Sequence, residues 1–280
     1  MKTNYHTHLK LCGHALGMTE DYVKKAIELG FDEIGMSDHG PIPREWMTPE
    51  EYQYNWLERQ MTLSDFHQIY LPDIDQAISK YKDKIKILKA IEIEYVEGHD
   101  DFYEQLRSHL DYMNLGVHYV FHQKTVYNLY EPINHEEIAY YADNIEKALA
   151  TGYFKILVHP DLFLFNYTSS AGMHREFDSY ARKVALRIIE AAVKNDVALE
   201  INAGGIAKQP FWIHGKMERP YPRTEFWKLV KPFAKSGEIK VIIGADAHIP
   251  DALGDLNYQK TIEFAKELGI PITDQLRFDK

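Results

Sequence analysis

The chain opens with Met1-Lys2-Thr3-Asn4-Tyr5-His6-Thr7-His8, a short extended stretch that ends in two histidines one residue apart. Residues two apart in a strand point to the same side, so His6 and His8 can present both imidazoles to one cation. A single His-x-His pair is a weak signal in a chain that contains 14 histidines. The pair gains weight because later strands end in the same kinds of side chain.

Six further apolar stretches are typical of buried strands, and helical patterns separate several of them. The strands are expected at about 33–37, 85–91, 112–117, 154–158, 197–202 and 239–245, and amphipathic helices at about 19–30, 134–149 and 176–194. Near-continuous Ile, Leu and Val indicate strands that are buried on both faces of a parallel sheet. The alternation predicts an α/β fold, a distorted parallel (β/α)7 barrel. An open, doubly wound sheet is the alternative, but it would gather chemistry at one switch point.

Residues 41–83 are predicted to be an insertion after the second strand. Its first half is rich in proline and aromatic residues, including Trp46 and Trp56, and its second half has two helical patterns separated by Pro72. Aromatic residues at this density usually pack a subdomain or lid against the barrel mouth. Because no linker rich in Gly, Ser or Pro interrupts the chain, residues 1–280 are expected to form one domain.

Composition limits the class of partner. A net charge of −10 argues against a nucleic-acid-binding surface. The absence of a long apolar run or a leader segment predicts a cytoplasmic protein with no membrane partner. The single cysteine, Cys12, excludes an internal disulfide and a thiolate zinc cluster, so imidazoles and carboxylates would hold any metal. The oligomeric state is not indicated.

The predicted strands end in side chains that bind metals. In a parallel barrel the carboxyl ends of all strands lie on one face, so residues just beyond them converge on one pocket. These residues are His6 and His8 after the first strand, His39 after the second, Glu92 at the third, His118 after the fourth, His159 after the fifth, and Asp246 and His248 after the seventh. Glu94 shares a face with Glu92, and either carboxylate could be the ligand.

The order of these residues resembles the polymerase and histidinol phosphatase (PHP) family of trinuclear metallophosphoesterases. The motifs are His6-x-His8, His14, Ser37-Asp38-His39-Gly40-Pro41, Ile91-Glu92, Val117-His118-Tyr119, His159-Pro160-Asp161 and Asp246-Ala247-His248. Together with Glu200-Ile201-Asn202 and Tyr221-Pro222, they look most like the histidinol-phosphate phosphatase branch. The sequence departs from the family pattern at Ala90, where glycine is common, and in the Ala-Gly-Gly that follows Asn202.

The resemblance implies three divalent metal ions and a set of ligands for each. The first ion would be held by His6, His8, Glu92 and Asp246, the second by His118, His159 and a bridging Glu92, and the third by His14, His39 and His248. Nitrogen and oxygen donors suit zinc, manganese or iron(II), and the ligand types do not choose among these metals.

The expected reaction is hydrolysis of a small phosphate monoester, with L-histidinol phosphate, an intermediate of histidine biosynthesis, as the favoured substrate. A metal-bridged hydroxide would attack phosphorus, and Asp246, His248 or His122 could assist the leaving alkoxide. Candidate phosphate-binding cations are Arg175, Lys208, His214 and Arg219. Asp38, Asp161 and Glu200 could orient ligand imidazoles. Glu94, Tyr95, Asp161 and the aromatic residues near Trp46 and Trp56 are candidates to bind the amine and imidazole of the substrate.

Three alternatives stay open at this point. The first is another phosphoesterase of the same family, a nucleotide phosphatase or nuclease, against which the acidic composition argues. The second is a non-catalytic metal-binding module, against which the complete ligand set argues. A metal-dependent amidohydrolase on another barrel is more distant, because it typically needs one or two ions.

Overall fold

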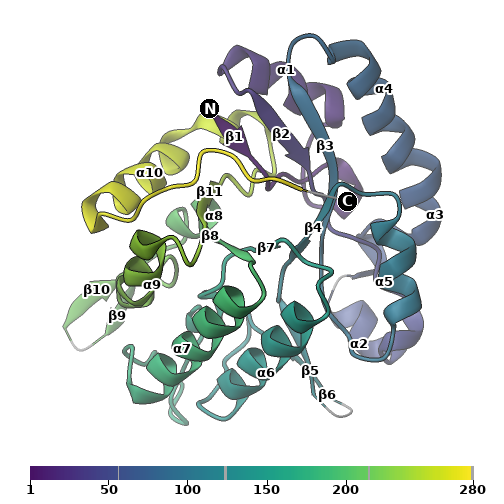
Figure 1. Ribbon diagram of the computed structural model, residues 1–280. Helices are drawn as coiled ribbons and strands as arrows, with labels where there is room; N and C mark the ends of the chain where they lie inside the picture. The colour runs from purple at the N-terminus through teal and green to yellow at the C-terminus, as the bar shows by residue number, and fades with distance from the viewer. Residues whose placement is uncertain (56, 123–124, 214, 279–280) are drawn as a thin grey trace.

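Seven parallel strands form one curved sheet in this computed structural model, which describes residues 1–55, 57–122, 125–213 and 215–278 (Figure 1). In sheet order the strands are β1 (Thr3–Asn4), β2 (Glu33–Met36), β3 (Lys86–Ile93), β4 (Tyr112–Leu115), β7 (Ile156–Leu157), β8 (Ala198–Asn202) and β11 (Val241–Gly244). Each hydrogen-bonded pair in this sheet is parallel. All seven carboxyl ends therefore face the same way.

The two edges of the sheet meet beyond β1 and β11. The His8 amide donates to the Ala247 carbonyl at 2.9 Å, and the Ala245 amide donates to Asn4 Oδ1 at 2.8 Å. Thr7 and Ala247 also form a parallel bridge. The sheet is consequently a nearly closed barrel, and the (β/α)7 prediction is confirmed.

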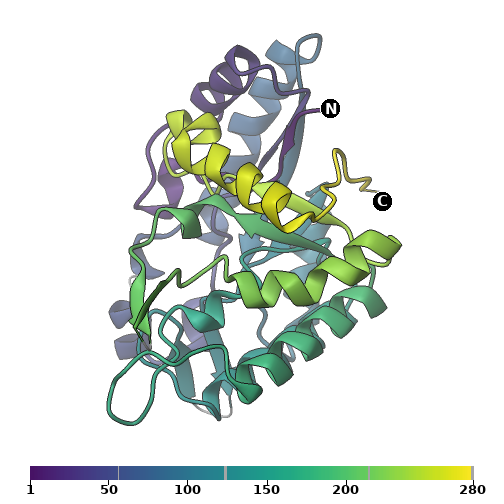
Figure 2. The same cartoon turned by 90° about the vertical axis from the view of Figure 1, so that its left-hand side faces the viewer.

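Helices surround the barrel, as Figures 1 and 2 show from two directions. They are α1 (Thr19–Glu28), α4 (Leu71–Tyr81), α5 (Asp100–Arg107), α6 (Glu137–Ala150), α7 (Ser179–Lys194), α9 (Thr224–Ser236) and α10 (Leu256–Leu268). A capping box is present at the start of α6, where Asn134 Oδ1 accepts from the Glu137 amide at 3.2 Å and Glu137 Oε2 accepts from the Asn134 amide at 2.7 Å. Each helix in the described chain is too short or too polar to span a lipid bilayer.

The barrel interior is closed at the amino ends of the strands. Alternate strand residues point inward, and Leu88, Ala90 and Tyr112 belong to one buried interior cluster. The C-terminal tail completes this cluster, because Phe278 stacks on Tyr112 with ring centroids 4.3 Å apart and the Leu276 amide donates to the Tyr5 hydroxyl at 3.0 Å. With this end filled, the opposite end of the barrel is left for a site.

The structure corrects the extent of the insertion. Helical backbone runs without a break through α3 (Leu63–Asp65), a π-helical turn (Phe66–Tyr70) and α4, so Pro72 does not separate two helices. Pro72 follows the π-helical turn closely, so the residue without an N–H lies where the helical hydrogen-bond pattern is already irregular. Ile74, Ala77 and Tyr81 are buried, and α4 contacts α1 and β3. This helix is the crossover between β2 and β3, and the added segment ends at about residue 62.

The remaining elements are short and lie in the loops. They are α2 (Pro49–Tyr54) in the insertion, the hairpin of β5 (Tyr119–His122) and β6 (Thr125–Asn128), α8 (Ala203–Ile206), and the hairpin of β9 (Phe211–Ile213) and β10 (Lys216–Glu218). Each of these follows the carboxyl end of a barrel strand. They therefore lie around the rim of the open end.

Tyr70 ties the helix after the insertion to the barrel. Its buried hydroxyl contacts the Met36 carbonyl at 2.8 Å and the Ala90 carbonyl at 2.7 Å, and it accepts from the Asp38 amide at 3.1 Å. We expect Tyr70→Phe to lower the free energy of unfolding by about 1–3 kcal/mol, because backbone groups that lose a partner remain buried. Urea denaturation would measure this. The control is Tyr180→Phe at a half-exposed position, for which a change of less than about 0.5 kcal/mol is expected; equal effects would contradict the role of the Tyr70 hydroxyl.

Candidate metal centre

The side chains predicted as metal ligands lie together at the open end of the barrel. Seven of them line a cavity of about 490 Å³: His8, His14, His39, Glu92, His118, Asp246 and His248. His6 and His159 lie beneath the surface of this cavity, with exposed fractions of 0% and 2%. The convergence follows from the parallel sheet, because each residue lies at the end of a strand or in the loop that follows it.

Glu92 is at the centre of the cluster. Its Oε1 atom lies 2.8 Å from His159 Nε2 and 3.6 Å from His118 Nε2. Its Oε2 atom lies 3.4 Å from His6 Nε2, 3.5 Å from His8 Nε2 and 3.3 Å from His39 Nδ1. One carboxylate thus faces imidazoles from five different positions in the chain.

Asp246 is a second acid in the cluster, beside Glu92. Its Oδ1 atom lies 3.0 Å from His8 Nε2, 3.6 Å from His6 Nε2 and 3.4 Å from His248 Nδ1. Asn202 donates to its other oxygen at 3.3 Å. Asp246 therefore shares His6 and His8 with Glu92.

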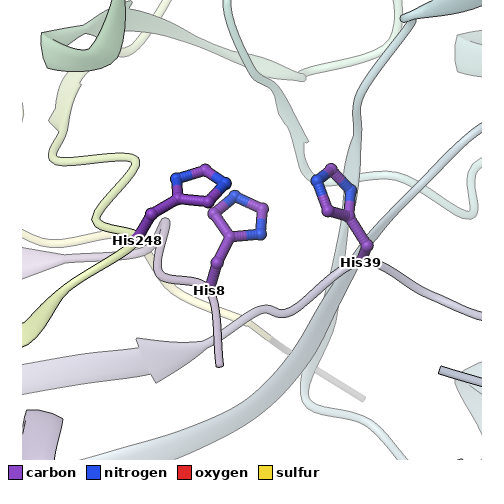
Figure 3. A group of neighbouring side chains, drawn as sticks. All are labelled: His8, His39 and His248. Atoms are coloured by element: carbon purple, nitrogen blue, oxygen red, sulfur yellow. The ribbon is translucent and has the colours of Figure 1, made fainter. Parts of the chain in front are cut away.

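Three imidazoles form the outer part of the cluster (Figure 3). The His8 ring centroid lies 4.1 Å from that of His248 and 4.4 Å from that of His39. His14 is next to them, with Nε2 3.0 Å from His248 Nε2. These rings come from loops after β1, β2 and β11, which are far apart in the sequence and adjacent around the barrel.

Two further carboxylates contact imidazoles of the predicted ligand set from behind. Glu200 Oε1 lies 2.8 Å from His6 Nδ1, and Glu94 Oε1 lies 2.8 Å from His118 Nδ1. Glu94 also accepts from the His118 backbone amide at 3.1 Å. Such contacts fix the orientation of an imidazole and leave its other nitrogen free toward a metal. The structure therefore separates the two acids at the end of β3, because Glu92 faces the cluster and Glu94 faces the back of His118.

The other two acids proposed to orient imidazoles are placed differently. Asp38 Oδ1 is 3.6 Å from His8 Nδ1, which is beyond hydrogen-bond range. Asp161 Oδ2 accepts from the Arg223 backbone amide at 2.6 Å, so it connects the loop after β7 to the start of α9. Burial raises the pKa of Asp161 to about 7, against the opposing effect of that hydrogen bond.

Glycines on neighbouring strand ends make room for the central acids. A Cβ atom at Gly116 would overlap with the Glu92 carboxylate, and one at Gly244 would overlap with the Glu200 carboxylate. Any larger residue at either position would displace an acid that contacts the ligand imidazoles. Both positions require glycine because a carboxylate lies directly against the backbone there.

The inner part of the cluster pairs ionised carboxylates with imidazoles. Burial alone would raise the pKa values of Glu92 and Asp246, but the surrounding imidazoles hold both well below their usual range. Burial alone would lower the pKa of His6, yet Glu200, Asp246 and Glu92 raise it well above its usual value. Ionised carboxylates at the base of the cavity therefore attract cations.

His39 and His248 are neutral by contrast, whereas Asp246, Asp38 and Glu92 overcome the effect of burial and raise the pKa of His8 to about 9. Burial and the neighbouring His8 lower the pKa of His248 to about 3 and that of His39 well below its usual value. A neutral imidazole keeps the lone pair that a metal needs. Neutral imidazoles above ionised carboxylates are a donor set for divalent cations.

Buried atoms without hydrogen-bond partners point to the same conclusion. Glu92 Oε2 and His8 Nδ1 are buried and make no hydrogen bond within the described residues. The Nε2 atoms of His6 and His8 lie 3.0 Å apart, as do those of His14 and His248. Groups of three donors within 4.8 Å include His6–His8–Glu92, Glu92–His118–His159 and His8–His39–His248. These groups fit divalent metal ions with nitrogen and oxygen ligands.

Cys12 lies close to this donor set. It is buried, within 4.8 Å of donors on His14 and His248, and free. Burial raises the pKa of its thiol, with Asp38 adding to the rise. The thiol thus keeps its proton, in agreement with a packing role.

The candidate phosphate-binding residues are dispersed. Lys208 lines the cavity. Arg175 pairs with Asp178 at 3.1 Å, His122 stacks on Tyr140 with centroids 3.7 Å apart, and Arg219 is half-buried; the cavity lining among the described residues contains none of the three. His214 lies outside the described residues.

The aromatic candidates for the far end of the substrate also lie elsewhere. Trp46 stacks on His99 at 4.2 Å and packs on Phe102, while Trp56 is outside the described residues. The lining includes instead Gln60, Tyr119, Tyr130 and Tyr221, which the sequence did not indicate as contacts. Two of them, Tyr119 and Tyr221, belong to the motifs Val117-His118-Tyr119 and Tyr221-Pro222. Gln60 and Tyr130 lie in loops whose paths no periodicity predicts.

Known proteins are similar to this chain in sequence. A protein from Deinococcus radiodurans named "Probable histidinol-phosphatase" is 25% identical over 89% of this chain and 87% of its own length. The "Histidinol-phosphatase" of Bacillus subtilis is 22% identical over 92% of this chain and 96% of its own length.

A solved structure has the same fold. The histidinol phosphate phosphatase of Lactococcus lactis, in complex with zinc, L-histidinol and phosphate, superposes with a TM-score of 0.68 at 19% identity, covering 97% of this chain and 95% of that one. Residues 4–204 match the PHP domain family. Since this match covers most of the chain and the fold agrees, the chain belongs to the PHP domain family.

Proposed function

We propose that this protein hydrolyses a small phosphate monoester, with L-histidinol phosphate as the favoured substrate and L-histidinol and phosphate as products. The observation that carries the proposal is the ring of five imidazoles around Glu92 at the open end of the barrel. The family and the names of the relatives support this reaction, and the Lactococcus protein that shares the fold was solved with zinc, L-histidinol and phosphate.

Three divalent ions fit the donor set in the arrangement that the family resemblance implies. His6, His8, Glu92 and Asp246 would hold the first ion, His118, His159 and Glu92 the second, and His14, His39 and His248 the third. Bound divalent ions supply Lewis acidity, which neutralises phosphoryl oxygens and lowers the pKa of water. Zinc, manganese and iron(II) all suit these ligands.

The protein residues have separate tasks in this proposal. Glu200 and Glu94 fix the ligand imidazoles of His6 and His118 from behind. Lys208 lines the cavity and would bind a phosphate oxygen that faces away from the base. Asp246 and His248 both line the cavity and are the candidates to assist the leaving alkoxide, whereas His122 stacks away from it.

The acidic composition fits a small substrate. With a net charge of −10, the protein would repel a nucleic-acid backbone outside the metal centre. The cavity of about 490 Å³ has room for a small phosphate ester. A nuclease activity is accordingly disfavoured.

The first prediction distinguishes the two acids at the end of β3. Glu92→Gln removes a charge that faces five imidazoles, so we expect loss of bound metal and a larger fall in kcat/KM than for any single histidine substitution. Glu94→Gln keeps Glu92 in place and should retain more metal and more activity. Elemental analysis and steady-state kinetics would measure both. The opposite ranking of the two variants would show that the central acid has been wrongly assigned.

The second prediction concerns Lys208. Truncation to Ala leaves the metal ligands untouched, so metal content should stay normal while kcat/KM falls by about 10- to 100-fold, the size of one charged hydrogen bond. Lys216→Ala removes the same charge from an exposed position in β10 and serves as the control. Unchanged kinetics for Lys208→Ala would remove this residue from the phosphate site.

The third prediction tests the substrate. We expect kcat/KM for L-histidinol phosphate to exceed that for glycerol phosphate by at least about tenfold, because glycerol phosphate has no ammonium group. Binding of that group by a matching site contributes more than about 1.4 kcal/mol, which corresponds to a factor of ten. Both esters are assayed with each of zinc, manganese and iron(II). Comparable values for the two esters would show that the reaction class is right and the substrate wrong.

A further inference from the structure

A second cavity, of about 810 Å³, adjoins the metal-lined cavity. His14, Gln60, Tyr119 and Tyr130 line both, so the two spaces meet beside the outer metal ligands. L-histidinol phosphate is a chain with the phosphate at one end, an ammonium group next to the ester carbon and an imidazole at the other end. A substrate with its phosphate on the metals must direct the rest of this chain somewhere.

The metal-lined cavity offers few partners for the organic half. Both oxygens of Glu94 are engaged by the His118 amide, and Oε1 also contacts the His118 ring. Glu92 and Asp246 face ligand imidazoles. In the lining formed by described residues, no carboxylate is left for a positively charged leaving group.

The second cavity does offer an available carboxylate. Glu131, on the loop after β6, accepts from the Tyr54 hydroxyl through Oε1 at 3.0 Å. Its Oε2 atom makes no hydrogen bond within the described chain and lies on an exposed side chain. The rings of Tyr54, Tyr119 and Tyr130 line the same space, and such rings favour a flat or cationic group.

Gln60 lies at the junction of the two cavities. Its side chain is half-buried and forms no hydrogen bond with any described residue. The amide carbonyl can accept from an ammonium group, and the amide nitrogen can donate to an oxygen. A side-chain amide with unused hydrogen-bonding groups at this point would face the middle of a bound substrate.

The order of groups along the substrate matches the order of these residues. We propose that the second cavity binds the leaving alcohol, with the Gln60 carbonyl accepting from the ammonium group and Glu131 accepting from an imidazole N–H among the tyrosine rings. The inference rests on the proposed function, because it assigns the half of the substrate that the metals do not contact. It also gives the insertion a role, since Tyr54 and Gln60 belong to it.

Calorimetry on the metal-loaded full chain in the presence of inorganic phosphate tests the assignment. The probes are L-histidinol, L-alaninol, which lacks the imidazole, and 3-(imidazol-4-yl)propan-1-ol, which lacks the amine. Glu131→Gln should weaken binding of the two imidazole compounds about fivefold, the size of one exposed ion pair, and leave L-alaninol unchanged. Gln60→Leu should weaken the two amines and leave the imidazolyl alcohol unchanged.

Matched controls carry the same substitutions outside both cavities. Glu50→Gln changes an exposed acid of α2, and Gln68→Leu changes an exposed residue of the π-helical turn; neither should alter any of the three affinities. Failure of the wild type to bind L-histidinol, or equal affinities in the wild type and both cavity variants, would overturn the inference. The readout is binding, so it stands apart from the ester comparison: a wild type that binds L-histidinol through Glu131 but does not prefer its phosphate ester would refute only the proposed function.

Discussion

The Glu92 carboxylate is the group on which the site depends. A buried carboxylate without partners is very costly, and Glu92 is 1% exposed. It is stabilised by imidazoles at 2.8–3.6 Å that come from the ends of β1, β2, β4 and β7. Those strands are held in fixed parallel register, so their carboxyl ends lie within one side chain of Glu92. The same strand register therefore forms the barrel and brings the donor cluster together.

The backbone at this end of the barrel is strained at two residues that belong to the cluster. His159 and Asp246 have φ values of 34° and 48°, in the left-handed region that side chains other than glycine adopt at a cost of about 1–2 kcal/mol. At both positions the chain leaves a strand and turns sharply, and this turn points the side chain back over the barrel. The His159 amide donates to Glu200 Oε2 at 3.0 Å, which helps to hold its turn. Regular strands alone would not converge so closely.

Much of the fold followed from sequence because its signals are local. Apolar runs located the strands, and the recurrence of His, Glu or Asp after them predicted the residues that the structure brings together. Strand periodicity could not choose between Glu92 and Glu94, because both point to one side of an extended chain. The family resemblance favoured Glu92, and in the structure the position of His118 separates the two acids. The sequence predicts two helices separated by Pro72 because proline is typical of a helix break, whereas the helix continues through Pro72 after the π-helical turn. Lys208, Arg175 and His122 could not be ranked, since loop paths decide which of them reaches the cavity.

The two cavities divide recognition between parts of the fold with different rigidity. Strand ends are fixed by sheet hydrogen bonds, which suits metal ligands because their distances must hold within a fraction of an ångström. The walls of the second cavity come from α2 and the residues after it, from the β5–β6 hairpin and the residues after it, and from residues 12–14 of the loop after β1. Surface loops and hairpins of this kind tolerate changes in length better than sheet strands do. Tyr70 couples the two, because its hydroxyl contacts β2 and β3 just before His39 and Glu92. The helix that follows the insertion is thus anchored on the strands that present His39 and Glu92, so residues of this rim can change while the donor atoms of the cluster keep their positions.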